Sequence, residues 1–307
     1  MIKNILVTGC AGFIGSSVCK SLKKNYKIYG FDDFSTGSKK NIIKEINLIN
    51  HKKFNQRKIL KSKIKYDAII HCAGQSSGEK SFWNPNDDHK RNFILTKNMV
   101  DFAAQNRIRK FIFTSSMSVY GDVNGMAKTS LNCSPKSFYG LNKLLSEKYI
   151  SYFHNKIDFT ILRLFNVYGP GQNLKIDYQG MVSIFLADLI KNNKISVKGS
   201  FKRYRDFIYI DDVVDIIKNS IRNKKLSNKI INLGTSKKTT LLRLINELCK
   251  IHLKKKRKKT IIQSLGSTPG DQFGIYSDKK IFEIKNSFTT LKKGLSKFYE
   301  YAVREIN

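Results

Sequence analysis

Three glycines spaced three residues apart near the N-terminus constrain this chain more than any other feature. The apolar residues 5–7 (Ile-Leu-Val) predict a short buried strand, and residues 14–24 have the spacing of a helix. Gly9, Gly12 and Gly15 lie between them. Glycine there permits a sharp turn, a close backbone approach to a pyrophosphate, and tight packing of helix on strand. The pattern is typical of the first βα unit of a doubly wound dinucleotide-binding domain.

An acidic residue closes the second predicted strand. Residues 27–31 predict that strand, and Asp32 follows it, about 20 residues after the glycines, as such a fingerprint requires. A carboxylate at this point accepts a hydrogen bond from the ribose 2′-hydroxyl and repels a 2′-phosphate. No basic residue directly follows Asp32. The pattern therefore favours NAD over NADP, and a nucleotide-free domain of the same fold is the weaker alternative.

Strand-like and helical segments continue to alternate beyond this unit. Residues 66–71 and 110–114 predict strands, and residues 92–105 between them have helical spacing. Such alternation predicts an α/β fold, a doubly wound parallel sheet with helices on both faces. The 307 residues, 41% of them apolar, suffice for one large domain or two interlocked ones.

Composition also bears on the setting of the protein. No run approaches the roughly 18 apolar residues of a membrane-spanning helix, and Met1 leads directly into the first strand without a secretory signal. The five cysteines are odd in number, scattered, and never spaced Cys-x-x-Cys. We therefore expect no disulfide framework and no metal site, and predict a reducing, cytoplasmic environment.

The net charge of +34 raises the question of a nucleic-acid or membrane partner. The excess is mostly lysine spread along the chain, and the one dense cluster, residues 254–259, has no interleaved aromatic residues for base stacking. We interpret this cluster as a solvated face, with an anion-binding patch as the alternative. No membrane partner is predicted, and nucleic acid is disfavoured.

A tyrosine and a lysine four residues apart carry the chemistry. Tyr139 and Lys143 lie at the start of a predicted helix and project from the same face. A lysine ammonium beside a phenol, with a cationic nicotinamide near, lowers the phenol pKa from about 10 and makes a base for a sugar hydroxyl. Ser115 and Ser116 follow the strand 110–114, at the edge where this architecture binds ligands. An exposed helix pair is the alternative for the Tyr-x-x-x-Lys motif alone.

These motifs together resemble the extended short-chain dehydrogenase/reductase family, in its NAD-dependent nucleotide-sugar epimerase/dehydratase branch. The resemblance extends nearly from end to end of the chain. The motifs that occur in family order are the glycine turn, Asp32, residues 70–74 (Ile-His-Cys-Ala-Gly), Asn92, the Ser-Ser-x-x-Val-Tyr-Gly run at 115–121, Tyr-x-x-x-Lys, and residues 162–171 and 205–212.

The resemblance implies a role for each matching residue. Tyr139 is the expected catalytic base, Lys143 its partner and a ribose ligand, and Ser116 the hydroxyl that orients the sugar. The implied cofactor-binding residues are Gly9, Gly12, Phe13, Ile14, Gly15, Asp32, Asp33, Ser35, Ile59, Leu60, Ala73, Gly74, Gln75, Asn92, Ser115, Tyr139, Lys143 and Phe165. The implied substrate-binding residues are Ser76, Ser116, Asn166, Arg205 and Asp271, with Asn166 and Arg205 on the nucleotide diphosphate.

Two segments depart from the family pattern. Lys58 precedes Ile59 and Leu60, where many relatives place an aspartate for the adenine amino group, so we expect NAD to be held less firmly than usual. Thr268 stands before Pro-Gly-Asp, where relatives often have an arginine for the diphosphate, and nearby lysines are the expected substitutes.

The expected reaction follows from what the serine motif lacks. Dehydratases of this branch carry Thr-Asp-Glu where this chain has Ser116-Met117-Ser118, so the acid–base pair for water removal is missing. We expect an epimerase, first a UDP-sugar 4-epimerase acting on UDP-glucose/galactose or their N-acetyl forms through transient oxidation by bound NAD. A CDP-sugar 2-epimerase, a keto-sugar reductase or a dehydratase remain alternatives, as does, more remotely, a degenerate RNA-binding member. By resemblance, the setting is polysaccharide biosynthesis.

The resemblance also implies the architecture. It predicts a seven-stranded Rossmann-type NAD domain over residues 1–166, to which residues 207–248 return because 229–234 reads as a further parallel strand. A smaller α/β substrate domain over residues 167–307 interleaves with it, and the site lies in the cleft between them. Helices near 92–105 and 139–154 form a homodimer bundle in relatives, so a homodimer is predicted.

Overall fold

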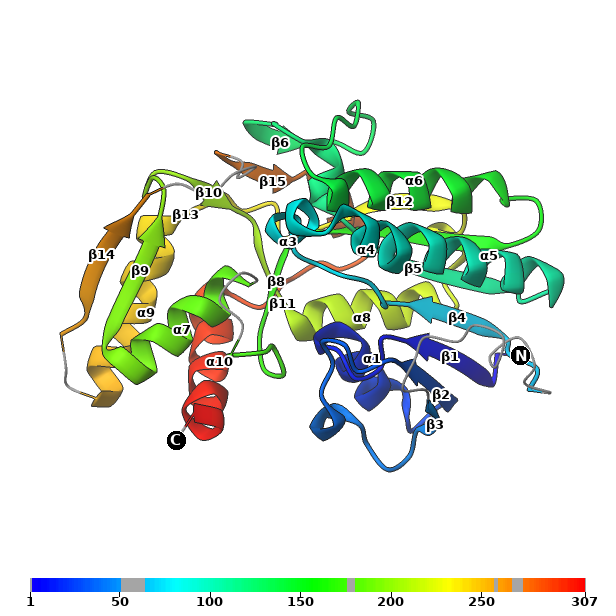
Figure 1. The fold of residues 1–307 in the computed structure, drawn as a ribbon, viewed down its shortest axis with the longest axis horizontal. Coiled ribbons are helices and arrows are strands. Elements are labelled where there is room, and N and C mark those ends of the chain that lie inside the picture. The colour runs from blue at the N-terminus through cyan, green and yellow to red at the C-terminus, as the bar shows by residue number, and fades with distance from the viewer. Residues whose placement is uncertain (1, 51–63, 176–179, 257–258, 267–272, 307) are drawn as a thin grey trace.

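A seven-stranded parallel sheet forms the centre of the molecule (Figure 1). The structure, a computed structural model, describes residues 2–50, 64–175, 180–256, 259–266 and 273–306. From one edge to the other the sheet contains β12 (Lys229–Leu233), β7 (Asp158–Leu164), β5 (Lys110–Ser116), β4 (Ala68–His71), β1 (Asn4–Thr8), β2 (Lys27–Asp32) and β3 (Asn47–Asn50). This is the doubly wound α/β fold that the sequence predicts.

The central strands are apolar on both sides because helices cover both faces of the sheet. In β1, Ile5 and Val7 join the core cluster beneath α1 (Phe13–Leu22) and α8 (Ile210–Ser220). Leu6 points to the opposite face and joins the cluster formed with α5 (Leu95–Gln105) and α6 (Phe138–Tyr152). Continuous apolar strands of this kind are what the runs in the sequence predict.

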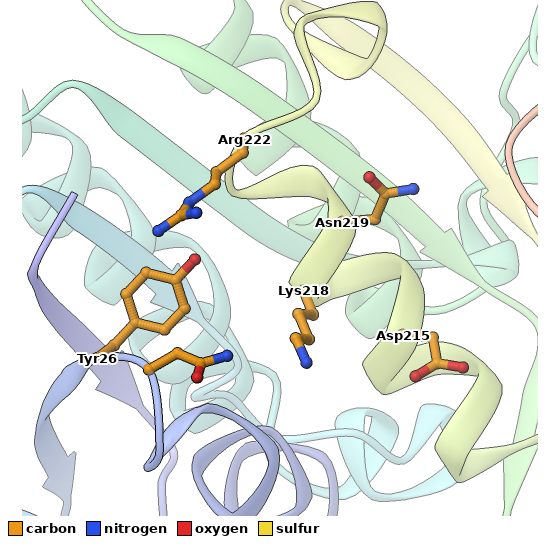
Figure 2. Close-up of a pocket in the computed structure, with 6 residues that line it drawn as sticks. Tyr26, Asp215, Lys218, Asn219 and Arg222 are labelled. Atoms are coloured by element: carbon orange, nitrogen blue, oxygen red, sulfur yellow. The ribbon is translucent and has the colours of Figure 1, made fainter. Parts of the chain in front are cut away.

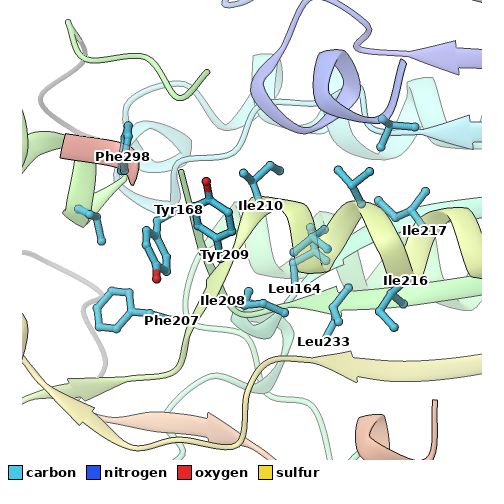
Figure 3. Packing of buried hydrophobic residues seen from close by; sticks show 14 of the residues in the cluster. Leu164, Tyr168, Phe207, Ile208, Tyr209, Ile210, Ile216, Ile217, Leu233 and Phe298 are labelled. Carbon is cyan, nitrogen blue, oxygen red and sulfur yellow. The ribbon is translucent and has the colours of Figure 1, made fainter. Parts of the chain in front are cut away.

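One core continues from the sheet into the C-terminal part of the chain (Figure 3). Leu164 of β7 and Leu233 of β12 pack near Ile216 of α8, and Tyr168, Phe207 and Phe298 extend the same cluster away from the sheet. Phe298 belongs to α10 (Leu291–Ile306), the last helix. The sheet and the C-terminal part of the chain therefore share one buried apolar core, which holds these two parts together.

A smaller group of elements lies beyond the sheet (Figure 1). The helix α7 (Met181–Asn192) packs against α10 and against α9 (Leu241–Lys256), and β9 (Lys194–Lys198) pairs in parallel with β14 (Ile261–Leu265). The predicted strand at 229–234 is β12, which pairs with β7 at the edge of the sheet. The chain thus returns to the sheet after leaving it, while the domain boundaries themselves stay a prediction.

Short strand pairs and single-turn elements complete the fold. The strand pairs are β8 (Asn166–Tyr168) with β11 (Phe207–Tyr209), β10 (Tyr204–Arg205) with β13 (Thr239–Thr240), and β6 (Gly125–Ala127) with β15 (Ile275–Ser277). The single-turn elements are η1 (Lys39–Asn41), η3 (Met117–Tyr120), η4 (Lys224–Leu226) and η5 (Lys279–Glu283).

The helical region that ends in α5 begins before residue 92, where the sequence predicts its start. Before it come α3 (Gly78–Trp83) and α4 (Pro85–His89), and α4 runs into α5 through a π-helical turn, η2 (Lys90–Ile94). Asn84 caps α4 by accepting from the Asp87 amide at 3.0 Å, and Pro85 sits at the first position, where it is well tolerated. A π-turn inserted in a helix often marks a functional site.

The basic cluster lies on the smaller part of the molecule. Lys254, Lys255 and Lys256 are exposed at the end of α9, and Lys259 is exposed before β14. This agrees with a solvated face for the lysines that are described; residues 257 and 258 lie outside the described part. No helix in the described ranges combines the length and apolar character needed to cross a bilayer.

Candidate active site

The glycine turn between β1 and α1 forms the base of a cavity. Gly9 has φ +71°, and a Cβ there would lie 2.8 Å from the backbone nitrogen of Ala73. A Cβ at Gly15 would overlap the carbonyl oxygen of Gly9, so this glycine is needed for the helix to approach the turn. The positive end of the α1 dipole faces the turn. The sharp turn and the tight packing of helix on strand, two of the three roles that the sequence assigns to these glycines, are thus met geometrically.

Asp32 is buried at the carboxyl end of β2, beside the same turn. Its Oδ2 accepts from the Ala11 amide and its Oδ1 from the Phe34 amide, both at 2.8 Å. Burial raises the pKa of this carboxyl despite these two bonds. Each carboxylate oxygen has capacity for a further donor. The side chain is therefore oriented to receive the hydroxyls of a ribose.

A salt bridge borders the cavity next to Asp32. The Arg91 Nη1 donates to Asp33 Oδ2 at 2.9 Å and to Ser35 Oγ at 2.8 Å, while its Nε donates to Asp87 at 2.8 Å. The predicted ligands Asp33 and Ser35 are thus tied to η2 across the opening. Sequence reasoning missed Arg91 because it lies in a different motif, 58 residues from Asp33.

The cavity fits the adenosine and diphosphate half of a dinucleotide. It has a volume of about 280 Å³ and opens at the carboxyl edge of the sheet. Seven of the predicted cofactor residues line it: Gly9, Gly12, Asp32, Asp33, Ser35, Ala73 and Gly74. The glycine cradle would admit a diphosphate, and Asp32 a ribose, so these residues fit NAD.

Tyr139 and Lys143 lie together on the buried face of α6. Tyr139 is 8% exposed, Lys143 4% and Ser116 8%. Lys143 Nζ donates to the Thr114 carbonyl at 3.1 Å and lies 4.8 Å from the Phe113 ring centre and 5.9 Å from that of Tyr139. The structure therefore brings the three predicted catalytic residues together at the end of β5.

Local sequence explains how closely α6 approaches η3, the turn that follows β5. Ser137 caps the helix by accepting from the Gly140 amide at 3.1 Å. A Cβ at Gly140 would lie 2.5 Å from the Ser118 carbonyl oxygen, so only glycine permits this contact. Ser116 is fixed in turn, because its Oγ accepts from the Ser118 amide at 3.1 Å.

The protein groups alone shift both catalytic pKa values toward the neutral forms. Burial raises the pKa of Tyr139 to about 12; the Ser116 hydrogen bond acts against this rise and the Asp88 charge adds to it. Burial likewise lowers the pKa of Lys143 to about 8. The expectation of a Tyr139 pKa below 10 includes a cationic nicotinamide beside the phenol and so stays a prediction; the protein groups by themselves raise this pKa, chiefly because the phenol is buried.

The other predicted cofactor residues that the structure describes are buried or half-buried and do not line the cavity. Ser115 Oγ donates to Glu147 at 2.5 Å, and Phe165 packs in a small apolar cluster with Val119 and Tyr120. Phe13 and Ile14 are half-buried in the first turn of α1. Gln75 and Asn92 are buried, and both donate side-chain hydrogen bonds to Asp88.

The predicted diphosphate ligands Asn166 and Arg205 come together through strand pairing. The backbone N–H of Asn166 donates to the backbone carbonyl of Asp206 at 3.0 Å, next to Arg205. Arg205 is 4% exposed and its Nη1 donates to the Tyr204 carbonyl at 2.8 Å; burial lowers its pKa to about 10. Ser76 is exposed in the loop after β4.

Three predicted residues lie outside the described part of the chain. Ile59 and Leu60 fall in residues 51–63, and Asp271 in residues 267–272. The adenine-side departure at Lys58 and the late substrate motif belong to the same ranges. These expectations stay predictions.

A larger cavity lies away from all of these residues (Figure 2). It has a volume of about 670 Å³ and is lined by Asn25, Tyr26, Asp215, Lys218, Asn219 and Arg222. The Arg222 guanidinium lies 5.4 Å from the Tyr26 ring centre. None of the predicted site residues lines it, whereas seven predicted cofactor residues line the smaller cavity at the sheet edge, which is therefore the candidate cofactor site.

Comparison with known proteins agrees with this geometry. The pattern of the NAD dependent epimerase/dehydratase family matches residues 5–234. A putative UDP-glucose 4-epimerase from Methanocaldococcus jannaschii is 35% identical over 252 residues, 80% of this chain and 79% of that protein. A UDP-glucose 4-epimerase from Thermotoga maritima with UDP-glucose is similar in structure, with TM-score 0.91, 27% identity, and 99% and 100% of the two chains covered.

A UDP-glucuronic acid 4-epimerase from Bacillus cereus, solved with UDP-glucuronic acid and NAD, is similar with TM-score 0.87 and 27% identity over 98% of this chain and 99% of that one. The resemblance seen in the sequence is thereby confirmed, and the cofactor is NAD. With the family pattern matched across the glycine turn, the Tyr139–Lys143 helix and the last strand of the sheet, the chain belongs to the NAD dependent epimerase/dehydratase family.

Proposed function

We propose that this protein is a nucleotide-sugar 4-epimerase, acting on UDP-glucose/galactose or their N-acetyl forms. The observation that carries the proposal is the buried cluster of Ser116, Tyr139 and Lys143 beside the glycine cavity, in a segment where Met117 and Ser118 replace the carboxylates of a dehydratase. The three similar epimerases described above support the choice of a UDP-sugar.

Each protein group has a distinct task in the proposed reaction. The Tyr139 phenolate takes the proton from the sugar O4′ and, as the hydroxyl, later returns it, and Ser116 orients the same oxygen. Lys143, as an ammonium, stabilises the Tyr139 phenolate. NAD, which the glycine turn and Asp32 would hold, would supply the redox chemistry by accepting a hydride from C4′ and giving it back to the opposite face. Its oxidised nicotinamide ring is cationic and would oppose the high pKa that burial gives Tyr139.

Dehydration is disfavoured by where carboxylates lie. Removal of water after oxidation needs an acid and a base placed near C5 and C6 of the sugar. Asp88 lies near enough to Tyr139 to influence its pKa, but its carboxylate is 1% exposed and accepts from three side-chain amides. It is therefore closed to a substrate, and epimerisation needs no such group.

Asn166 and Arg205 are the proposed ligands of the nucleotide diphosphate. The Arg205 guanidinium is planar and can pair with two phosphate oxygens at once. Asn166 can donate from its Nδ2 to a phosphate oxygen, while its Oδ1 is buried without a hydrogen-bond partner among the described residues and could accept from a hydroxyl of the ligand.

A homodimer built on α6 is part of the same proposal. Phe138, Leu141, Leu145 and Tyr152 are exposed along one stripe of this helix, between 39% and 83%. Phe82 of α3 extends the stripe, with its ring 6.0 Å from that of Phe138. Contiguous exposed apolar surface of this kind favours an interface between proteins. Sedimentation at several concentrations tests this part.

The first experiment is to denature the purified protein and identify any nicotinamide nucleotide it releases. Near-stoichiometric NAD would support a cofactor recycled in place, and a panel of UDP- and CDP-sugars would then be assayed for interconversion. We expect UDP-glucose/galactose or the N-acetyl pair to be converted, and Tyr139→Phe to lose at least about 100-fold in turnover. Release of NADP, or inversion at C2′ of a CDP-sugar, would replace the proposal with one of the alternatives.

A further inference from the structure

A single buried carboxylate ties together the segments around the Tyr139–Lys143 site. Asp88 is 1% exposed in α4. Its Oδ1 accepts from Gln75 Nε2 at 2.7 Å and from Asn92 Nδ2 at 2.9 Å, and its Oδ2 accepts from Asn142 Nδ2 at 2.8 Å. The three amides come from the loop after β4, from η2 and from α6. Asp88 therefore holds the catalytic helix against the two segments that face it.

The chemistry of the carboxylate dictates how each amide is turned. An ionised carboxylate can only accept hydrogen bonds, so each amide must present its NH₂ group to Asp88 and direct its oxygen elsewhere. The Asn142 oxygen meets His89 Nδ1 at 2.8 Å. The Asn92 oxygen is buried and has no hydrogen-bond partner among the described residues.

The Asn92 oxygen is directed toward the cofactor side of the site. A Cβ placed on Gly74 would lie 2.5 Å from Asn92 Oδ1 and 3.5 Å from Lys143 Nζ. The free face of Gly74 is therefore bordered by one acceptor and one cation. If the amide were reversed, an NH₂ group would face this point beside an ammonium, and two donors would compete for the same ligand atoms.

Asp88 also differs from the other carboxylate near Lys143. Glu147 is neutralised within the protein because Arg163 Nη2 donates to it at 2.7 Å. The partners of Asp88 are neutral amides, so its charge is left to act on Lys143. In agreement, Asp88 keeps the Lys143 pKa from falling further, and does so more than Glu147.

We propose that Asp88 is a positioning residue for the Tyr139–Lys143 site: it fixes the amide directions of Asn92 and Asn142 and places a negative charge behind the Lys143 ammonium. The inference rests on the proposed function in that Tyr139 and Lys143 are taken to do the chemistry. Asp88 itself does not touch the reacting atoms.

The groups around Lys143 allow a pH test. β5 contributes the Thr114 carbonyl and the Phe113 ring, and α6 contributes Tyr139 and Glu147. Cys72, after β4, has its pKa raised to about 12, and His71 has its pKa lowered to about 3, so both are neutral between pH 6 and 10. His89, on the same helix as Asp88, bonds to Asn142. Lys143 is thus the expected source of an alkaline limb.

The decisive variant is Asp88→Asn, which keeps the shape and removes the charge. Asn142 can accommodate it by turning its amide to accept from the new NH₂ group, so we expect the fold to survive. Loss of the charge lowers the pKa of Lys143, and the alkaline limb of the kcat profile should move to lower pH by about 1 unit. Above that limb the rate should fall about tenfold, with less than about threefold change in KM.

Two further variants separate positioning from general damage. The double variant Asp88→Asn/Asn142→Asp moves the carboxylate onto α6 opposite the new amide and should bring the alkaline limb back. Asp101→Asn on α5 removes a carboxylate that pairs with Lys97 and Tyr149 away from the site, and should match the wild type. A wild-type pH profile in Asp88→Asn, or a rate loss without a shift and without rescue, would overturn the proposal.

A measurement without sugar keeps this inference distinct from the proposed function. NADH affinity, followed by fluorescence, should decrease as the pH rises and Lys143 loses its proton. In Asp88→Asn this decrease should begin about 1 pH unit lower. If the wild type converts no UDP-sugar but the shift is present, the proposed function fails and the role of Asp88 stands. If turnover is present and neither profile shifts, the proposed function stands and the proposed role of Asp88 fails.

Discussion

Two buried carboxylates hold α6 in place: Glu147, on α6 itself, pairs with a cation, and Asp88, on α4, accepts from neutral amides. Glu147 accepts from Arg163 Nε at 3.0 Å and Nη2 at 2.7 Å and from Ser115 Oγ. Asp88, on the other side, accepts from three neutral amides. Both carboxylates are 1% exposed.

The difference shows two ways of keeping a charge inside a protein. A buried ion pair cancels its charge locally, and removal of one partner leaves the other uncompensated. A carboxylate surrounded by amide donors is solvated without being neutralised, so its field extends to its neighbours. On α6 the first arrangement lies toward β7 and the second toward the cofactor side of Tyr139 and Lys143. The ion pair is suited to holding the helix, and the amide-bound carboxylate to tuning the site.

The largest expected effect comes from breaking the ion pair. Arg163→Met would leave the Glu147 carboxylate buried without its cation, at a cost of about 3–5 kcal/mol in the free energy of unfolding. Urea unfolding of both proteins measures this. The double variant Arg163→Met/Glu147→Leu, which removes both charges, should recover most of the loss. A single variant that costs less than about 1 kcal/mol would show that the pair is not the anchor of α6.

A buried neutral histidine should add an acid sensitivity that neither carboxylate explains. His71 is buried between Thr8 and Thr96, and its folded pKa is about 3. Unfolded histidine titrates near 6.5, so between the two values the unfolded state binds more protons and stability falls as pH falls. The loss from pH 6.5 to pH 4 should reach about 3 kcal/mol.

His71→Gln isolates this contribution from that of the carboxylates. The acid-dependent loss of unfolding free energy should be smaller in the variant than in the wild type, because glutamine does not titrate. Unfolding in urea at pH 7 and pH 4 gives both slopes. Equal slopes in the two proteins would mean that folding leaves the His71 pKa near its unfolded value of about 6.5.

Removal of one amide donor should cost less than removal of the Arg163 cation. Asn142→Leu leaves Asp88 Oδ2 without its bond, but Gln75 and Asn92 remain, so we expect a loss of about 1–2 kcal/mol. Thermal unfolding against Asn106→Leu, an amide that bonds only within the end of α5, provides the comparison. A loss as large as that of Arg163→Met would remove the distinction between the two sides of the helix.

The smallest stability effect is expected at the rim of the cofactor cavity. Arg91 is partly exposed, so Arg91→Ala should change the free energy of unfolding by less than about 1 kcal/mol. NADH affinity should fall a few-fold, since Asp33 and Ser35 lose the side chain that holds them. Arg109→Ala, which removes a comparable exposed pair with Asp67, should leave NADH affinity unchanged. Equal affinity in Arg91→Ala and the wild type would show that the pair does not shape the cavity.

Local pattern was enough to predict much of this molecule. The glycine turn, Asp32 and the alternation of strands with helices predicted the parallel sheet and the cofactor, because backbone sterics and strand periodicity act over a few residues. The helix at 92–105 was predicted in part: its start was missed because the Asn84 cap and the π-turn carry no apolar periodicity. The burial that raises the Tyr139 pKa was not visible in the sequence, while the expected lowering depends on a bound nicotinamide and stays a prediction.

The sequence by itself predicted the residues that carry the chemistry: Tyr139 and Lys143 from their spacing on one helix, and Ser116 from the family resemblance. Only the tertiary structure decided how these residues are charged and oriented. Asp88 and Asn142 are 54 residues apart, and Arg91 and Asp33 are 58 apart. The amide directions and pKa values depend on desolvation and on contacts between distant segments, which exist only after the sheet has brought those segments together.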